Sequence, residues 1–163
     1  HKLPWGILIF FGGSLAVSDV MTNVGVTAWL SGELSLLHGL NIVLVVIIVT
    51  LLLIVVSEMM SNVATITAFL PILAAMADAM QINPILILVP ATLAASCAFM
   101  LPGASAPNAI AFGTGHLKVK DMIKTGLTLN ILSSVAIVLF TFTLISYAFG
   151  VDLSQMPDWA SRK

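Results

Sequence analysis

The sequence predicts an all-α integral membrane protein, and two features of its composition support the membrane location. Hydrophobic residues make up 60% of the 163 residues and charged residues only 8%. Soluble domains carry roughly 25% charged residues, so a soluble globule of this composition would lack polar side chains for its surface. The formal net charge of -1 offers no cationic excess for nucleic acid. We therefore expect a multi-pass membrane protein, in contact with the lipid bilayer and without a nucleic-acid partner.

The first 38 residues predict one membrane-spanning helix followed by an interfacial helix. An apolar stretch runs from Leu3 to Val17. From Val20 to His38 apolar and polar residues alternate loosely, as expected of a helix that lies along the membrane surface. The chain starts at His1 in an apolar context and lacks the charged segment of a secretory signal, so we expect a fragment of a longer protein.

The next segment predicts a re-entrant helical hairpin. Ile42 to Val56 is an almost pure Val/Ile/Leu run, and at 1.5 Å per residue it reaches roughly 22 Å, short of the roughly 30 Å hydrocarbon core. A polar turn, Ser57 to Asn62, leads directly into a second apolar run, Val63 to Met80. Such a turn inside the membrane needs protein or a water-filled cavity around it. The alternative is an ordinary surface loop between two full spans, with Ser61 as a helix N-cap.

A discontinuous transmembrane helix is expected next. The apolar segment Ile85 to Leu101 stops at Pro102 to Asn108, where two prolines and a glycine cannot continue a hydrogen-bonded helix. A shorter piece, Ala109 to Gly115, follows, and the last span is expected from about Met122 to Phe149. The alternative is that the two prolines bound a plain extramembrane loop.

The cations predict the orientation of these segments. Residues 19–81 contain no Lys or Arg, whereas three lysines cluster just before the last span: Lys118, Lys120 and Lys124. Since short cytoplasmic loops carry an excess of basic residues, we expect this loop to face the cytoplasm and the open end of the hairpin to face outside.

The two interruptions are the candidate functional sites. A broken helix exposes N–H groups at helix N-termini, which favour anions, and carbonyls at helix C-termini, which favour cations. The N–H groups near Asn62 and the Ser61 hydroxyl are therefore candidates for a substrate carboxylate, and the preceding carbonyls for Na⁺. The break after Leu101 offers the same two sets of groups. Transporters bind substrate and coupling ion at paired breaks, and the sequence shows no nucleophile–base pair that would indicate an enzyme.

Three polar residues within apolar segments have more than one interpretation. Glu58 is either a functional carboxylate at membrane depth or part of a surface turn. Asn130 and Ser133 are one turn apart, and we expect them to make helix–helix contacts rather than to bind a ligand. Cys97 is the single cysteine of the sequence, so an internal disulfide or a zinc–thiolate site is excluded.

Two motifs resemble signatures of the divalent anion:sodium symporter family. Ser61–Thr65 (SNVAT) resembles its second Ser-Asn-Thr signature, and Leu101–Ile110 (LPGASAPNAI) resembles its Pro-x-Ala-Thr-Pro-Pro-Asn-Ala segment. The resemblance covers essentially the whole chain. It implies the C-terminal half of a sodium-coupled symporter for di- or tricarboxylates such as succinate, malate or citrate, with Na⁺ as the coupling ion.

The resemblance also implies an architecture. The chain would be one of two inverted-topology repeats in a homodimer that works by an elevator motion, and the missing N-terminal half would supply the other repeat. Residues 1–38 would then belong to the scaffold, residues 39–121 would form the transport domain with hairpin and broken helix, and residues 122–163 would form the last transmembrane helix and an extracytoplasmic tail.

Carried over by motif position, the resemblance implies two ligand sets. The substrate carboxylate would be bound by Ser61, Asn62, Val63 and Ser105. Sodium would be bound by Ser57, the Met60 carbonyl, Asn62 and the Ala104 carbonyl. Val63 replaces a threonine of the signature and Ala106 replaces the first of two prolines. The motifs therefore do not identify which anion is the substrate. A sodium-independent dicarboxylate antiporter, a transporter of sulfate or another anion, an arsenite or TRAP-type permease subunit, and a non-transporting scaffold remain alternatives.

Overall fold

The computed structural model describes residues 39–144, together with isolated positions on either side. Within residues 39–144 every regular element is a helix, which confirms the predicted all-α class. The elements are α3 (Ile42–Met59), α4 (Asn62–Ala79), α5 (Ile85–Ala95), α6 (Ala106–Gly113) and α7 (Val119–Thr143). The helices expected at 3–17 and 20–38, and the C-terminal tail, fall outside the described range.

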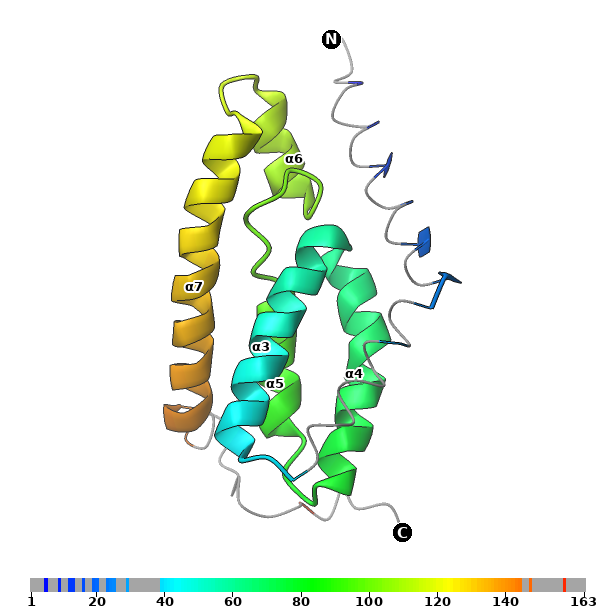
Figure 1. Cartoon of the computed structure of the whole chain (residues 1–163), viewed down its shortest axis with the longest axis vertical. Coiled ribbons are helices and arrows are strands. Elements are labelled where there is room, and N and C mark those ends of the chain that lie inside the picture. The colour runs from blue at the N-terminus through cyan, green and yellow to red at the C-terminus, as the bar shows by residue number, and fades with distance from the viewer. Residues whose placement is uncertain are drawn as a thin grey trace.

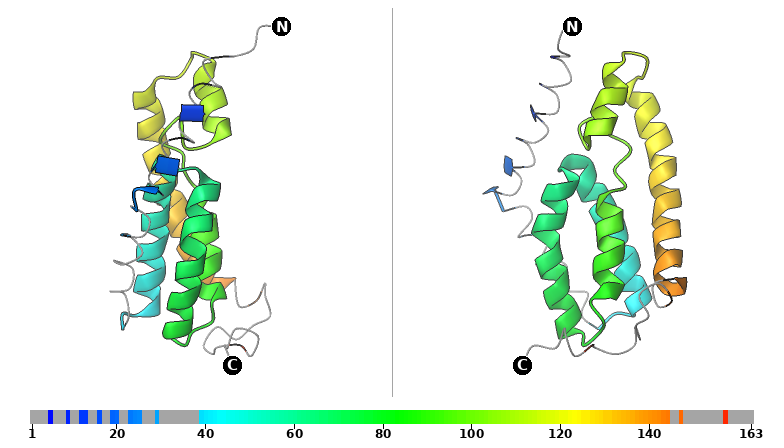
Figure 2. Two further views of the ribbon diagram at one scale, coloured as in Figure 1. Left: turned by 90° about the vertical axis from the view of Figure 1, so that its right-hand side faces the viewer. Right: turned by 180° about the vertical axis from the view of Figure 1, so that it is seen from behind.

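Helix α5 is the centre of the described bundle. Helices α3 and α4 form an antiparallel hairpin, and α5 packs against both of them and against α7 (Figure 1). Helix α7 runs beside α3 and continues past the hairpin tip to the level of α6, as Figure 2 shows from two further directions. The hairpin tip therefore lies partway along α7 rather than at its end.

The core is formed by apolar side chains at helical spacing. On α3, Val45, Val49 and Leu53 share one face and are each at most 2% exposed. Leu53 and Phe69 belong to the same buried cluster as Ala91 of α5. Small side chains such as Ala91 let α5 approach its neighbours closely, which is the usual way that helices pack where lipid replaces water.

The first arm of the hairpin is longer than the sequence predicted. It does not stop at Val56 but continues through Met59 as an 18-residue helix. Ser57 and Glu58, expected in the turn, are helical and buried, because their polar groups find partners inside the protein. The expected shortness of this arm was therefore wrong: α3, α4 and α7 are each long and apolar enough to cross a membrane.

The interruption predicted at Pro102 to Asn108 is confirmed, with limits that lie earlier in the chain. Helix α5 already ends at Ala95, and ten residues without regular structure precede α6. Helix α6 begins at Ala106, with Pro107 in its first turn, where a missing N–H costs nothing. We call residues 96–105 the helix break.

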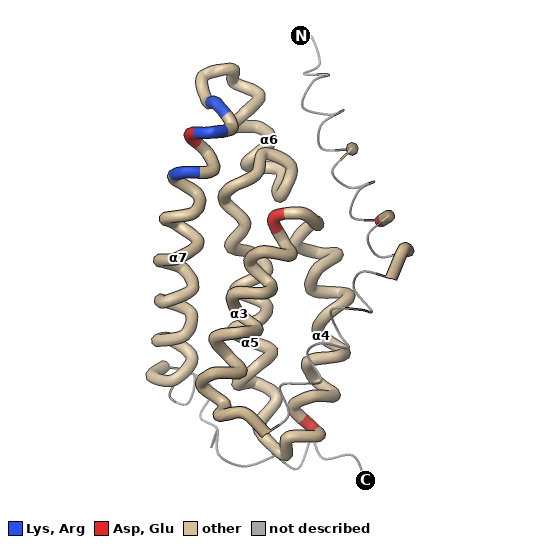
Figure 3. Tube along the Cα trace, in the orientation of Figure 1, with Lys and Arg blue, Asp and Glu red and all other residues tan. Residues whose placement is uncertain are grey.

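The basic residues of residues 39–144 gather at one end of the bundle. Figure 3 shows basic positions where α7 begins, at the end opposite the open end of the hairpin. Lys120, Asp121 and Lys124 lie in the first turns of α7, which starts at Val119, and Lys118 is its N-cap. The lysines and the hairpin opening thus lie at opposite ends, as the predicted topology requires.

Replacing a core aromatic residue should destabilise the bundle. Phe69 is 1% exposed, so Phe69→Ala removes a buried ring and leaves a cavity, and the unfolding free energy should fall by about 3–5 kcal/mol. Phe142→Ala is the matched control because Phe142 is 38% exposed. Thermal unfolding in detergent should show a lower midpoint for Phe69→Ala; equal midpoints for the two variants would contradict this packing.

Candidate functional site

The hairpin tip brings two helix ends of opposite polarity together. Helix α3 ends at Met59 and α4 begins at Asn62, so only Met60 and Ser61, both extended, separate them. The Ser61 hydroxyl accepts a hydrogen bond from the backbone N–H of Ala64 at 3.2 Å and so caps α4. The first turn of α4 contains no acidic residue. Its positive end is therefore not neutralised by its own first turn and can attract an anion.

Buried polar atoms are found in both arms next to the hairpin tip. The side-chain oxygen of Asn62 is buried and has no hydrogen-bond partner among the described residues. Ser57 and Met60 are both fully buried, and the Ser57 hydroxyl donates to the Ile54 carbonyl at 3.0 Å. Thr50, Thr65 and Asn130 also have such an oxygen, and a bound ion or an ordered water explains such atoms. Amide and carbonyl oxygens are ligands that hard cations prefer.

The helix break is held in shape by Asn108. Its side-chain amide donates to the Ala98 carbonyl at 2.8 Å and to the Leu101 carbonyl at 3.1 Å. The backbone N–H of Asn108 donates to the Ser105 hydroxyl at 3.4 Å, which caps α6. The motif alone assigns no role to Asn108. Its position three residues after a serine at a helix start was the available signal.

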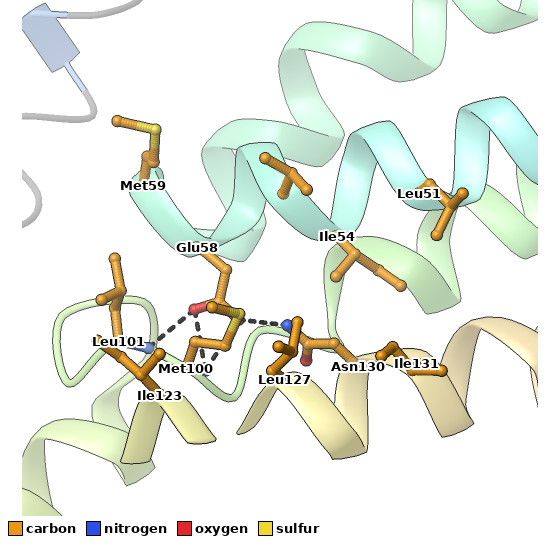
Figure 4. A pocket seen from close by; sticks show the side chains of 11 residues that line it. Leu51, Ile54, Glu58, Met59, Met100, Leu101, Ile123, Leu127, Asn130 and Ile131 are labelled. Atoms are coloured by element: carbon orange, nitrogen blue, oxygen red, sulfur yellow. Dashed lines mark hydrogen bonds between the residues drawn. The ribbon is translucent and has the colours of Figure 1, made fainter. Parts of the chain in front are cut away.

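Glu58 joins the hairpin tip to the helix break. Its carboxylate accepts from the Met100 N–H at 2.9 and 3.1 Å and from the Leu101 N–H at 2.9 Å. The side-chain amide of Asn130 in α7 donates to the same carboxylate at 2.8 Å. Figure 4 shows the carboxylate between the break and α7. Glu58 is 7% exposed, so the alternative of a residue in a surface turn is wrong.

The expected helix–helix contact of Asn130 is confirmed. Its side-chain amide donates to Glu58 of α3, so Asn130 connects α7 to the rest of the bundle. The role expected for Ser133 stays a prediction. Gly126 lies one turn before Asn130 and against the backbone of Phe99 and Met100, a contact that the sequence does not predict.

A cavity of about 290 Å³ adjoins Glu58 and Asn130 (Figure 4). Apart from these two residues its lining consists of apolar side chains, including Leu51, Val55 and Leu127. An anionic substrate would meet an acidic carboxylate there and no cation, so the cavity is unsuited to a dicarboxylate. The candidate anion site is instead at the starts of α4 and α6.

The remaining predicted ligands, Ala104, Ser105 and Val63, lie close in sequence to the helix break or to the hairpin tip. Ala104 is buried at 2% exposure, and Ser105 is half-buried at the start of α6. Val63 is 74% exposed, so its side chain is not enclosed by the described part of the chain. Through Glu58 the structure joins the two segments that carry the predicted ligands, while the individual ligand roles stay predictions.

Comparisons with known proteins agree with one another. The family described as "Sodium:sulfate symporter transmembrane region" matches residues 1–149. The sodium-dependent dicarboxylate transporter SdcS of Staphylococcus saprophyticus is 42% identical over 153 residues, which is 94% of this chain and 30% of the relative. SdcS of Staphylococcus aureus strain MRSA252 is 44% identical over 154 residues, which again make up 94% of this chain and 30% of the relative. The chain thus spans about 30% of the length of these relatives, which are transporters and not enzymes.

Asn108→Asp should loosen the helix break. An ionised aspartate cannot donate to the two carbonyls that Asn108 binds, and each buried group left without a partner costs about 1–3 kcal/mol. The unfolding free energy should therefore fall by about 2 kcal/mol or more, seen as a lower thermal midpoint in detergent.

Asn41→Asp is the matched control. Asn41 uses its side-chain oxygen to accept from the Val43 N–H at 2.9 Å, and aspartate retains that acceptor. This control should leave the midpoint unchanged. If Asn108→Asp were equally harmless, the amide would not hold the break.

Proposed function

The chain belongs to the sodium:sulfate symporter family, and from this premise we propose that it is the C-terminal repeat of a sodium-coupled transporter for di- or tricarboxylates such as succinate, malate or citrate. The observation that carries the proposal is the buried side-chain oxygen of Asn62 at the start of α4, which has no hydrogen-bond partner among the residues that the structure describes. The relatives are named as sodium-dependent dicarboxylate transporters, which supports sodium as the coupling ion and a dicarboxylate as the substrate.

The position of the hairpin tip supports a re-entrant hairpin. Glu58, at the end of α3, binds Asn130 near the middle of the 25-residue helix α7. At 1.5 Å per residue, Asn130 lies about 16 Å from the start of that helix and about 20 Å from its end. If α7 crosses the bilayer, the tip is located well inside it, even though both arms have the length of a full span.

The helix ends at the two interruptions provide complementary ligands. Helices α4 and α6 each begin with a serine cap and have no acidic residue in the first turn, so both N-termini suit the carboxylates of a substrate. The cation would bind the Asn62 side-chain oxygen, Ser57 and the carbonyls of Met60 and Ala104. Sodium bound there orders the tip, and the ordered tip completes the anion site, which couples the two binding events.

The contacts of Glu58 support movement of these parts as one body. Since one carboxylate ties the hairpin, the helix break and α7 together, a transport step can shift them jointly, as an elevator motion requires. In this proposal the remaining length of the transporter supplies the second repeat, and two copies form a homodimer in a bacterial inner membrane.

Sulfate is the second candidate substrate, because the family description names it. Helix N-termini bind sulfate and carboxylate alike, so the two starts of α4 and α6 do not discriminate between them. Competition of unlabelled sulfate, succinate and citrate against succinate uptake identifies the substrate: inhibition by the carboxylates alone supports the proposal, and inhibition by sulfate alone contradicts it.

Uptake of labelled succinate into proteoliposomes with the intact transporter should require sodium. Replacing external Na⁺ by choline removes the driving ion, so we expect the initial rate to fall at least tenfold. A sodium-independent antiporter would instead keep its rate in choline and respond to succinate loaded inside the vesicles. That result would overturn the coupling proposal.

Asn62→Ala should weaken sodium and substrate together. Since one side chain serves both sites, we expect the sodium concentration for half-maximal uptake and the substrate KM each to rise about tenfold, equivalent to about 1.4 kcal/mol. Thr67→Ala is the control, because the exposed Thr67 hydroxyl donates to the Val63 carbonyl of its own helix. A change in substrate KM with unaltered sodium dependence would show that the site is not shared.

A further inference from the structure

Helix α7 approaches the helix break too closely for any side chain at Gly126. A Cβ atom added there would lie 2.4 Å from the Phe99 carbonyl oxygen and 2.7 Å from the Met100 Cα. Both are backbone atoms, so a rotamer change cannot relieve the clash. The break could accommodate a larger residue only by moving away from α7.

Asn130 lies four residues after Gly126 and therefore on the same face of α7. Its amide donates to Glu58, and Glu58 accepts from the N–H groups of Met100 and Leu101. The backbone of residues 99–101 is thus pressed against Gly126 on one side and hydrogen-bonded to a carboxylate on the other. Two contacts therefore fix the same three-residue stretch.

We propose that Glu58, Gly126 and Asn130 are positioning residues that hold the helix break against the hairpin tip and thereby set the affinity for the coupling cation without binding it. This inference rests on the proposed function, because it assigns these residues to the same sodium site. Glu58 lies between Ser57 and Met60, and its donors Met100 and Leu101 precede Ala104 by a few residues. A change in the Glu58 contacts therefore shifts the hairpin tip, with Ser57 and Met60, relative to the segment that contains Ala104.

Exchange of the paired groups tests the inference. Asn130→Asp replaces the donor that faces Glu58 with a second carboxylate, and the repulsion should separate α7 from the tip. The double variant Glu58→Gln/Asn130→Asp restores complementarity: the glutamine amide donates to the new aspartate, and the glutamine oxygen accepts from the break. Ser134→Ala is the control, because this buried hydroxyl donates to the Ile131 carbonyl of its own helix.

The sodium dependence of uptake by the intact transporter separates positioning from simple loss of folded protein. We expect the sodium concentration for half-maximal uptake to rise about tenfold in Asn130→Asp and to return to within threefold of wild type in the double variant. A merely structural lesion would lower the maximal rate at unchanged sodium dependence. Gly126→Ala should also raise the sodium concentration for half-maximal uptake, although alanine has a higher helix propensity than glycine.

Cys97 gives a readout that does not depend on transport. It lies in the helix break and is partly buried, so its rate of labelling by a maleimide, with cysteines elsewhere in the intact protein replaced, reports whether the break has opened. Labelling should be faster in Asn130→Asp and in Gly126→Ala, and should return towards the wild-type rate in the double variant. Ser134→Ala should label like wild type.

The possible outcomes distinguish the two proposals. If wild-type uptake does not need sodium, the proposed function fails, and Cys97 labelling still decides whether the three residues hold the break. If uptake needs sodium but the double variant is no better than Asn130→Asp, or fails to fold as that variant does, the inference is wrong. Unchanged labelling and unchanged sodium dependence in all variants would overturn it as well.

Discussion

Glu58 brings a carboxylate into an apolar bundle, and a buried acid is costly unless donors surround it. Three donors from two other parts of the chain meet this requirement: the N–H groups of Met100 and Leu101 and the amide of Asn130. The same bonds also satisfy two N–H groups of the helix break that have no helical partner. The end of α3, the break and the middle of α7 therefore depend on one another, and none of them can move far alone.

The described bundle also has a buried interior and an exposed apolar surface. Helix α5 supplies small buried side chains at the centre, while Leu51, Val55 and Ile131 remain exposed on α3 and α7. Exposed apolar groups are acceptable where lipid or further protein surrounds them, which agrees with the membrane family to which the chain belongs. Ser61, Asn62 and Ser105 lie where helices begin, and the candidate site is located there.

Local sequence patterns predicted much of the fold but not the ends of its helices. The hairpin arms and the interruption near Pro102 follow from apolar runs, a polar turn and helix-breaking residues. The extension of α3 through Glu58 and the early end of α5 at Ala95 do not, since residues 98–101 are held by partners far along the chain or beyond the break. Likewise Ser61 and Asn62 could be selected as candidates from a motif, whereas the role of Gly126 is visible only when the break lies against it.

The central claim is that the two interruptions meet inside the membrane through Glu58. A cryo-electron microscopy structure of the intact transporter in lipid nanodiscs with sodium tests it most directly. We expect the Glu58 carboxylate within hydrogen-bonding distance of the Met100 and Leu101 N–H groups, with the hairpin tip in the middle third of the bilayer. A tip at the headgroup level, with Glu58 facing water and the break detached from it, would contradict the account.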